Sequence, residues 1–387
     1  QLNSTDPGDY GNYDTADRPR QLKIDQIVLH DTEEYYDKTL GIFTDPTSYT
    51  SAHYVIRSSD GHVTQMVRTK DVAWQAGNWY TNSHSIGIEQ EGFAIKGATW
   101  FTEPLYRSSA RLVRYLAAKY DVPLDRQHII GHDNVPGIDP AHVATMHWDP
   151  GPFWDWGHYL SLLGRPILPA GSPHSPVVTI NPDFARNQQT VTDCEGDGSP
   201  TTQAASFVWL RTAPSADAPL ASDPTLHPDG KPGSDCANDW GDKASAGQKF
   251  VVAGRSGDWT AIWFDGQKVW FQDTHASTPA YSLVVTPKPG VDSIPTYGRA
   301  YPESSAYPAD IPDQGVAALP YRIKAGQSYA TAARIPSTDY YYAKTIDSSL
   351  PDDHTVVRGH TKYLLIQLGH RVGYVKASDV RVHLLAG

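Results

Sequence analysis

Hydrophobic positions in the first part of the chain follow strand and helix periods in turn. Short apolar runs rich in β-branched residues are typical of buried strands, and a 3.6-residue pattern between them predicts helices. Thr102 is placed to cap a helix that ends before the proline of YDVP, and a further helix is expected to open at Pro152. Strands alternating with helices indicate an α/β sheet with helices packed on it. The expected strands are KIDQIVLH (23–30), the hairpin AHYVIRSSDGHVTQMV (52–67), SIGIEQEG (85–92) and HIIGH (128–132).

The pattern changes after a Pro/Gly/Ser-rich segment at 164–176. From there on, short alternating strands are joined by tight turns, and a weak internal repeat indicates two small all-β barrels. A Pro-rich segment at 286–315 is not expected to form a packed element. We therefore predict a multi-domain chain, with an α/β domain at 1–168 and β-domains at 176–286 and 287–387, the last beginning with a Pro-rich linker. The strand-like segments are 206–215, 247–273, 324–331 and 362–380.

Charge and hydropathy narrow the set of partners. The formal net charge is −11, and the chain has no Lys/Arg-rich block. Nucleic acid and anionic membranes are therefore not expected partners, because proteins bind them by neutralising phosphates. No apolar run approaches the roughly 18–20 residues that span a bilayer. We expect a monomer whose ligand is neutral or mixed in charge.

The two cysteines bear on the compartment. Cys194 and Cys236 both lie in Gly/Ser/Asp-rich turn sequence, which suits a loop-closing disulfide. A two-cysteine metal site would need further ligands close by, and the neighbouring sequence holds none. A disulfide implies an oxidising compartment, and the chain begins with Gln rather than Met. The simplest interpretation is a processed, secreted protein.

Three side chains carry the candidate chemistry. His30 and His132 each close a predicted strand. One such histidine is more often hydrogen-bonded within a core than a ligand, but ligand clefts in open α/β sheets form where strands end, so two of them there predict a site. Asp149, immediately before Pro150, adds a carboxylate, and two imidazoles plus a carboxylate form the ligand set of a catalytic zinc. The alternative is that Asp149 only caps the helix that follows it.

Five motifs resemble the zinc-dependent type-2 N-acetylmuramoyl-L-alanine amidases, a family related to the peptidoglycan recognition proteins. They occur in the family's order and cover nearly all of 20–165. The resemblance implies that His30, His132 and Asp149 hold zinc and that Glu89 is the carboxylate facing the water to be activated. The motifs are LH (29–30), SAHYVIRSSDG (51–61), SIGIEQEG (85–92), GHD (131–133) and WDPGPFWDW (148–156).

The resemblance also implies the substrate. It makes 1–168 a zinc amidase domain that cuts the amide between N-acetylmuramic acid and L-alanine in peptidoglycan, with His53, Trp74 and Trp148 as substrate-binding residues. A second interpretation is a recognition protein that binds muropeptide on the same fold without cutting it. Such relatives typically lose a zinc ligand, whereas this chain keeps all three and Glu89.

The chain departs from the family pattern in two places. The insert GIDPAHVATM (137–146) lengthens the link between the second and third ligands, and it brings His142 and His147 into range as rival ligands. Where the family commonly has a lysine that stabilises the oxyanion, this chain has His147, which could do that work over a narrower pH range. Glu91 alternates with Glu89 on one strand face, and we expect it to be a supporting or solvent-facing residue.

The β-rich segments resemble bacterial Src-homology-3-like domains over 200–273 and 318–383. In such amidases these domains serve as wall-targeting partners, which implies a secreted, extracellular, cell-wall-associated enzyme. All the candidate chemistry precedes the linker. We therefore expect the isolated segment 1–168 to keep hydrolysis of soluble muropeptide and to lose part of its activity on intact wall.

Overall fold

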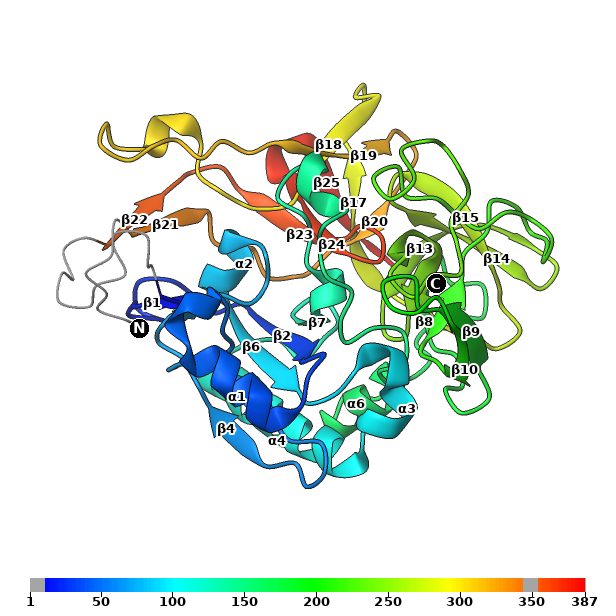
Figure 1. The fold of residues 1–387 in the computed structure, drawn as a ribbon. Helices are drawn as coiled ribbons and strands as arrows, with labels where there is room; N and C mark the ends of the chain where they lie inside the picture. Colours follow the sequence, from blue (N-terminus) through cyan, green and yellow to red (C-terminus); the bar gives the residue numbers. More distant parts are fainter. Residues whose placement is uncertain (1–10, 344–353, 387) are drawn as a thin grey trace.

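The computed structural model describes residues 11–343 and 354–386. Its N-terminal unit is built on a five-stranded sheet with the order β4-β3-β6-β2-β7, in which only β4 is antiparallel to its neighbour (Figure 1). The predicted strands and hairpin are confirmed. Because β2, β6 and β7 are parallel, their carboxyl ends share one edge of the sheet. The strands are β2 (Gln26–Asp31), β3 (Tyr54–Ile56), β4 (Val63–Gln65), β6 (Ser85–Gln90) and β7 (Ile129–Gly131), and β1 (Tyr13–Asp14) pairs with β5 (Val72–Ala73) beside them.

Two helices follow the sequence pattern, one of them with a different start. In α4 (Glu103–Tyr120), the Thr102 hydroxyl accepts the Leu105 N–H as predicted. The predicted start of a helix at Pro152 is wrong: α6 (Trp156–Leu162) begins later, because the Asp155 carboxylate accepts the His158 N–H. Asp149 therefore caps no helix. The remaining helices are α1 (Tyr36–Thr44), α2 (Trp79–His84), α3 (Gly97–Trp100) and α5 (Pro140–Val143), and none in the described part of the chain is long and apolar enough to cross a bilayer.

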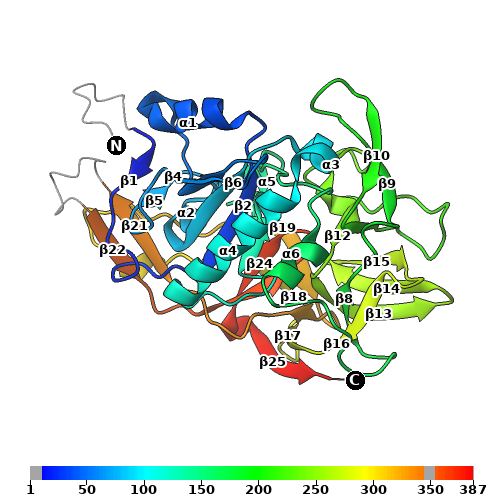
Figure 2. The ribbon, with the colours of Figure 1, turned by 90° about the horizontal axis from the view of Figure 1, so that it is seen from below.

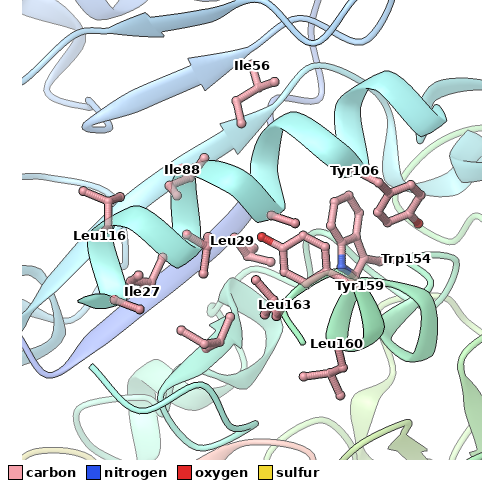
Figure 3. Packing of buried hydrophobic residues seen from close by; sticks show 14 of the residues in the cluster. Ile27, Leu29, Ile56, Ile88, Tyr106, Leu116, Trp154, Tyr159, Leu160 and Leu163 are labelled. Carbon is pink, nitrogen blue, oxygen red and sulfur yellow. The ribbon is translucent and has the colours of Figure 1, made fainter. Parts of the chain in front are cut away.

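The two faces of this sheet are covered differently. Ile27 and Leu29 pack under α4 and α6 in the cluster drawn in Figure 3. Val28 and Ile130 point to the opposite face, where they join buried residues of the C-terminal region: Tyr297, Leu365, Val372 and Tyr374. The prediction of a sheet flanked by helices thus holds for one face. Strands from the far end of the chain cover much of the other.

The segment after the linker forms the first β-rich unit. Its main sheet has the order β15-β14-β13-β8-β16, with the pairs β9–β10 and β11–β12 beside it. Cys194 and Cys236 are disulfide-bonded, as predicted. The strands are β8 (Val177–Ile180), β9 (Gln188–Thr192), β10 (Pro200–Ala204), β11 (Phe207–Trp209), β12 (Lys243–Ser245), β13 (Lys249–Ser256), β14 (Trp259–Phe264), β15 (Gln267–Gln272) and β16 (Ser277–Ala280).

The second β-rich unit begins earlier than the predicted boundary. Strand β17 pairs with β25 and β20, so residues before 287 belong to it. The Pro-rich segment contains β18, which lies between β19 and β24; the ladder tolerates Pro295 because its register shifts there. Figure 2 shows the antiparallel pair β21–β22 beside β1, where the Tyr341 hydroxyl donates to the Thr15 carbonyl. The strands are β17 (Ser282–Pro287), β18 (Ser293–Tyr297), β19 (Ala318–Lys324), β20 (Tyr329–Ala330), β21 (Asp339–Ala343), β22 (His354–Arg358), β23 (Tyr363–Gln367), β24 (Val372–Lys376) and β25 (Val380–Leu385).

The shared core changes what is expected of the isolated N-terminal segment. Burying one large apolar side chain stabilises a fold by roughly 1.5–3 kcal/mol, and the net stability of a domain is only about 5–15 kcal/mol. Removing residues after 168 uncovers both Val28 and Ile130. We predict that the 1–168 fragment aggregates or melts well below the full chain, and that it loses the hydrolysis of soluble muropeptide that the resemblance implies. Thermal unfolding and activity assays of the fragment beside the full chain check this, and a stable, active fragment would contradict it.

Candidate metal centre

Three buried side chains converge at the carboxyl edge of the N-terminal sheet. Nδ1 of His30 lies 3.1 Å from Oδ2 of Asp149, and Nδ1 of His132 lies 3.0 Å from Oδ1. The candidate ligand atoms all lie within 4.8 Å of one another. Two atoms held 2.0–2.1 Å from a tetrahedral ion are about 3.3 Å apart. The donor set and its spacing therefore fit a zinc-sized cation.

Sheet topology and one glycine place these ligands. His30 lies on β2, and His132 directly follows β7. Asp149 is brought to them because the Asp133 N–H donates to the Asp149 carbonyl at 2.8 Å. A Cβ on Gly131 would lie 2.8 Å from Cδ of Pro150. Glycine at this position lets the end of the loop approach β7 closely enough to deliver the third ligand.

The orientation of His30 is held by a residue that the sequence did not reveal. Nε2 of Gln75 donates to the Ser85 hydroxyl at 2.7 Å, so its Oε1 faces Nε2 of His30 at 2.5 Å. Nε2 of His30 donates to this oxygen, and Nδ1 is left as the nitrogen that faces Asp149 and the centre. Metal-binding histidines are typically held in this way through their second ring nitrogen. A Cβ on Gly87 would lie 2.7 Å from the Gln75 side chain, so the glycine makes room for this contact. Gln75 lies in AWQAG, which matches none of the motifs above.

Glu89 lies beside the ligands, paired in register with His30. Its side chain is buried, and within the described residues Oε2 has no hydrogen-bond partner. Burial raises the pKa of Glu89 to about 8; the charge of Asp149 adds to this rise, and His30 opposes it. The carboxyl group can therefore exchange a proton near neutral pH.

The charges of the three ligand side chains depend on one another. Burial lowers the pKa of His132 to about 4, so this imidazole is neutral near pH 7. Burial acts in the same direction on His30, but Glu89 and Asp149 outweigh it and raise the pKa of His30 to about 9. Burial acts to raise the pKa of Asp149, yet the contacts with His132 and His30 hold it well below its usual range. Asp149 is thus ionised and ready to bind a cation.

The two rival histidines lie in different places. The His142 side chain is exposed, and its Nδ1 lies 2.7 Å from Oδ1 of Asp139, outside the centre. His147 is 75% exposed, with Nδ1 3.7 Å from Oδ1 of Asp149 and its ring 4.9 Å from that of His132. His147 therefore borders the centre without belonging to the buried cluster.

Glu91 differs from Glu89 in its contacts. Its two oxygens accept the N–H groups of Tyr36 and Ser58, at 2.9 and 2.7 Å. Each carboxylate oxygen accepts one backbone N–H group, so Glu91 holds the segments around Tyr36 and Ser58 against the end of β6. The expectation of a supporting residue fits these contacts.

A cleft of about 520 Å³ opens beside the centre. Its lining includes His147, Trp148 and Asp149, together with Asp193 and Glu195 of the first β-rich unit. The Trp148 indole N–H donates to Oε2 of Glu195 at 2.8 Å. Trp148 is thus positioned on the cleft wall, and the loop that carries Cys194 forms part of the same wall.

The other two predicted substrate-binding residues lie elsewhere. His53 is fully buried: its Nδ1 accepts the Gly87 N–H at 3.0 Å, and Arg18 lies 2.8 Å from Nε2. Burial and the charge of Arg18 lower the pKa of His53 to about 3. Its nitrogens are engaged within the protein, so the structure does not present His53 to a substrate. The Trp74 indole N–H donates to Asp14 at 3.1 Å, and its role in substrate binding stays a prediction.

Two imidazoles and a carboxylate at the edge of an α/β sheet, with a buried carboxyl group beside them, are typical of metal-dependent hydrolases. Residues 20–152 match the family model described as N-acetylmuramoyl-L-alanine amidase. The N-acetylmuramoyl-L-alanine amidase A of Achromobacter lyticus is 31% identical over 167 residues, which cover 41% of this chain and 90% of that protein. The chain therefore belongs to the N-acetylmuramoyl-L-alanine amidase family.

Further similarities lie within the same range. The 1,6-anhydro-N-acetylmuramyl-L-alanine amidase AmpD of Haemophilus influenzae is 34% identical over 117 residues, 29% of this chain and 57% of that protein. Among solved structures, AmpDh3 from Pseudomonas aeruginosa has a TM-score of 0.32 and 20% identity, covering 45% of this chain and 70% of that one. The family model ends at residue 152, before the β-rich units.

The ligand set predicts which variants lose metal. Asp149→Ala removes the oxygens that lie between both imidazoles, so it should abolish stoichiometric metal binding, measured as metal content after dialysis. His142→Ala is the matched control and should keep full metal content, because its ring lies outside the centre. Metal lost from the His142 variant and kept by the Asp149 variant would overturn the assignment.

Gln75 should tune metal affinity without binding the ion. Gln75→Ala frees the His30 ring to rotate and to change tautomer, and such supporting contacts are typically worth roughly 10–100-fold in affinity or activity. We expect a weaker dissociation constant of this order in competition with a chelator. Ser85→Ala, which removes only the partner that orients the amide, should produce a smaller change of the same sign. An unchanged constant in Gln75→Ala would exclude this role.

Proposed function

We propose that this protein is a secreted zinc hydrolase that cleaves the amide bond between N-acetylmuramic acid and the L-alanine of the stem peptide in peptidoglycan. The observation that carries the proposal is the buried cluster of His30, His132 and Asp149 with an unpaired oxygen of Glu89 beside it. The names of the relatives support the same bond and substrate. When bound, zinc supplies Lewis acidity that polarises a carbonyl and lowers the pKa of water to about 7.

The side chains of the chain divide the remaining work. Glu89 takes a proton from water at Oε2 and passes it to the leaving nitrogen, as the C–N bond breaks and a C–O bond forms. His147 borders the centre from the exposed side and, when protonated, donates to the oxyanion. Trp148 lines the cleft that receives the substrate. His30 and His132 stay fixed as ligands, His30 through its contact with Gln75.

The β-rich units support action at the cell wall. We assign them as two Src-homology-3-like domains that bind wall polymer and raise the local concentration of the catalytic unit. The Cys194–Cys236 bond supports an oxidising, extracellular location. The alternative function, a recognition protein that binds muropeptide without cutting it, is less favoured because all three ligands and Glu89 are in place.

Digestion of purified peptidoglycan tests the proposal directly. Mass spectrometry should show stem peptides with a free N-terminal L-alanine, while the glycan strands stay intact. Chelator-treated protein should release none, and added zinc should restore release. New reducing sugar ends as the main product would mean a glycosidase, and binding without any release would favour the recognition protein.

Glu89→Gln isolates the proton-transfer step. The substitution preserves shape and removes only the proton acceptor, so turnover should fall by ~10²–10⁴-fold while metal content and unfolding temperature change little. Glu91→Gln is the matched control: its amide keeps one acceptor oxygen and replaces the other with a donor, so one of the two backbone contacts is lost and stability should fall more than turnover. A Glu89 variant within a few-fold of wild type would show that this carboxyl group is structural.

A further inference from the structure

The turn between β23 and β24 reaches from the C-terminal unit to the metal centre. At its end, the Arg371 guanidinium is buried, with 6% of the residue exposed. Its Nη1 donates to the carbonyls of His132 and Val135, at 3.2 and 2.5 Å, and its Nη2 donates to the carbonyl of His147 at 2.9 Å. One side chain therefore holds both ends of the segment that carries His132 and leads to Asp149.

Several contacts hold Arg371 and the turn in place. The guanidinium lies over the Trp240 ring of the first β-rich unit, 4.0 Å from its centroid. The preceding residue, His370, has Nε2 2.8 Å from Oδ2 of Asp133 and Nδ1 2.9 Å from the Lys243 carbonyl. All three units of the chain thus meet at residues 370–371.

The need for such a contact follows from the long loop between two of the candidate ligands. Residues 133–148 separate His132 from Asp149, and the entropy cost of holding two chain ends together grows with the length between them. The ends of this loop must stay within ligand distance of one cation. A guanidinium is suited to this because its donors point from a rigid plane toward several acceptors at once. Arg371 donates to the carbonyl of His132 itself and to the carbonyl of His147, which lies two residues before Asp149.

We propose that Arg371 is a positioning residue that sets the separation of His132 and Asp149 and the placement of His147. The C-terminal unit is then a structural part of the active site in addition to any role in wall binding. This inference deepens the proposed function and rests on it for the identity of the reaction. Its effect on metal binding does not depend on which bond is cut.

The test uses the full chain with Arg371→Met and Arg371→Lys. Arg334→Met is the matched control, because Arg334 also bonds from the C-terminal unit to the N-terminal one, at Asp121 beyond the end of α4. The measurements are the zinc dissociation constant by chelator competition, kcat and KM on soluble muropeptide, and the unfolding temperature with and without zinc. We expect Arg371→Met to weaken zinc binding by roughly 10–100-fold and to lower kcat with KM within a few-fold. Lysine keeps the charge and should recover part of both, while Arg334→Met should match wild type in both.

Three results would overturn the proposal. One is a folded Arg371→Met variant with wild-type zinc affinity and kcat. Another is an equal loss in Arg334→Met, which would show a general effect of the interface. The third applies if Arg371→Met does not fold: it is a folded Arg371→Lys variant that keeps wild-type zinc affinity and kcat. Weakened zinc binding in a protein that cleaves no muropeptide amide would reject the proposed function and leave the role of Arg371 supported.

Discussion

The contact of one carboxylate with two imidazoles at a buried sheet edge is the interaction on which the rest of the site depends. An ionised carboxylate away from water is unfavourable unless charge and hydrogen bonds compensate it. Asp149 is compensated from both sides, by His30 and by His132. The carboxylate can occupy this position only if β2 and β7 end side by side and the loop at 133–148 brings Asp149 back to their ends.

All three units of the chain help to hold this loop and the residues around it in place. The N-terminal sheet has one face under α4 and α6, as in an ordinary α/β domain, and its second face against aromatic residues of the C-terminal strands. The first β-rich unit contributes Asp193 and Glu195 to the lining of the cleft and Trp240 beneath Arg371. The units therefore pack against one another around the candidate metal centre.

The parts that could be predicted from the sequence are the locally encoded ones. Thr102 and the apolar spacing after it specify α4, and the strand ends at His30 and His132 specify where ligands gather. The helix predicted to begin at Pro152 begins at Trp156 instead, because the Asp155 side chain accepts the His158 N–H and caps the helix there. His53 has the residue type of a ligand, but only the fold shows that Arg18 and Gly87 engage its ring.

The contacts that could not be predicted join residues far apart in sequence. Gln75 matches no motif, and its importance comes from Ser85 and His30 meeting around it. Arg371 is separated from His132 by 239 positions. The pairing of β17 with β25 is of the same kind. It places Ser282–Pro287 in the second β-rich unit, whereas composition alone puts the boundary between 286 and 287. No local pattern encodes such meetings, because each depends on how the units dock.

The pairing of β17 with β25 also has a consequence for synthesis. Chains emerge from the ribosome from the amino end and fold domain by domain where they can. Here, the strand that begins at Ser282 must wait for its partner at Val380–Leu385 before the second β-rich unit can close. Until then, the aromatic residues that cover Val28 and Ile130 lack their finished framework. The nascent protein therefore carries His30, His132 and Asp149 well before it carries a completed site, because the second β-rich unit closes only after β25 has emerged.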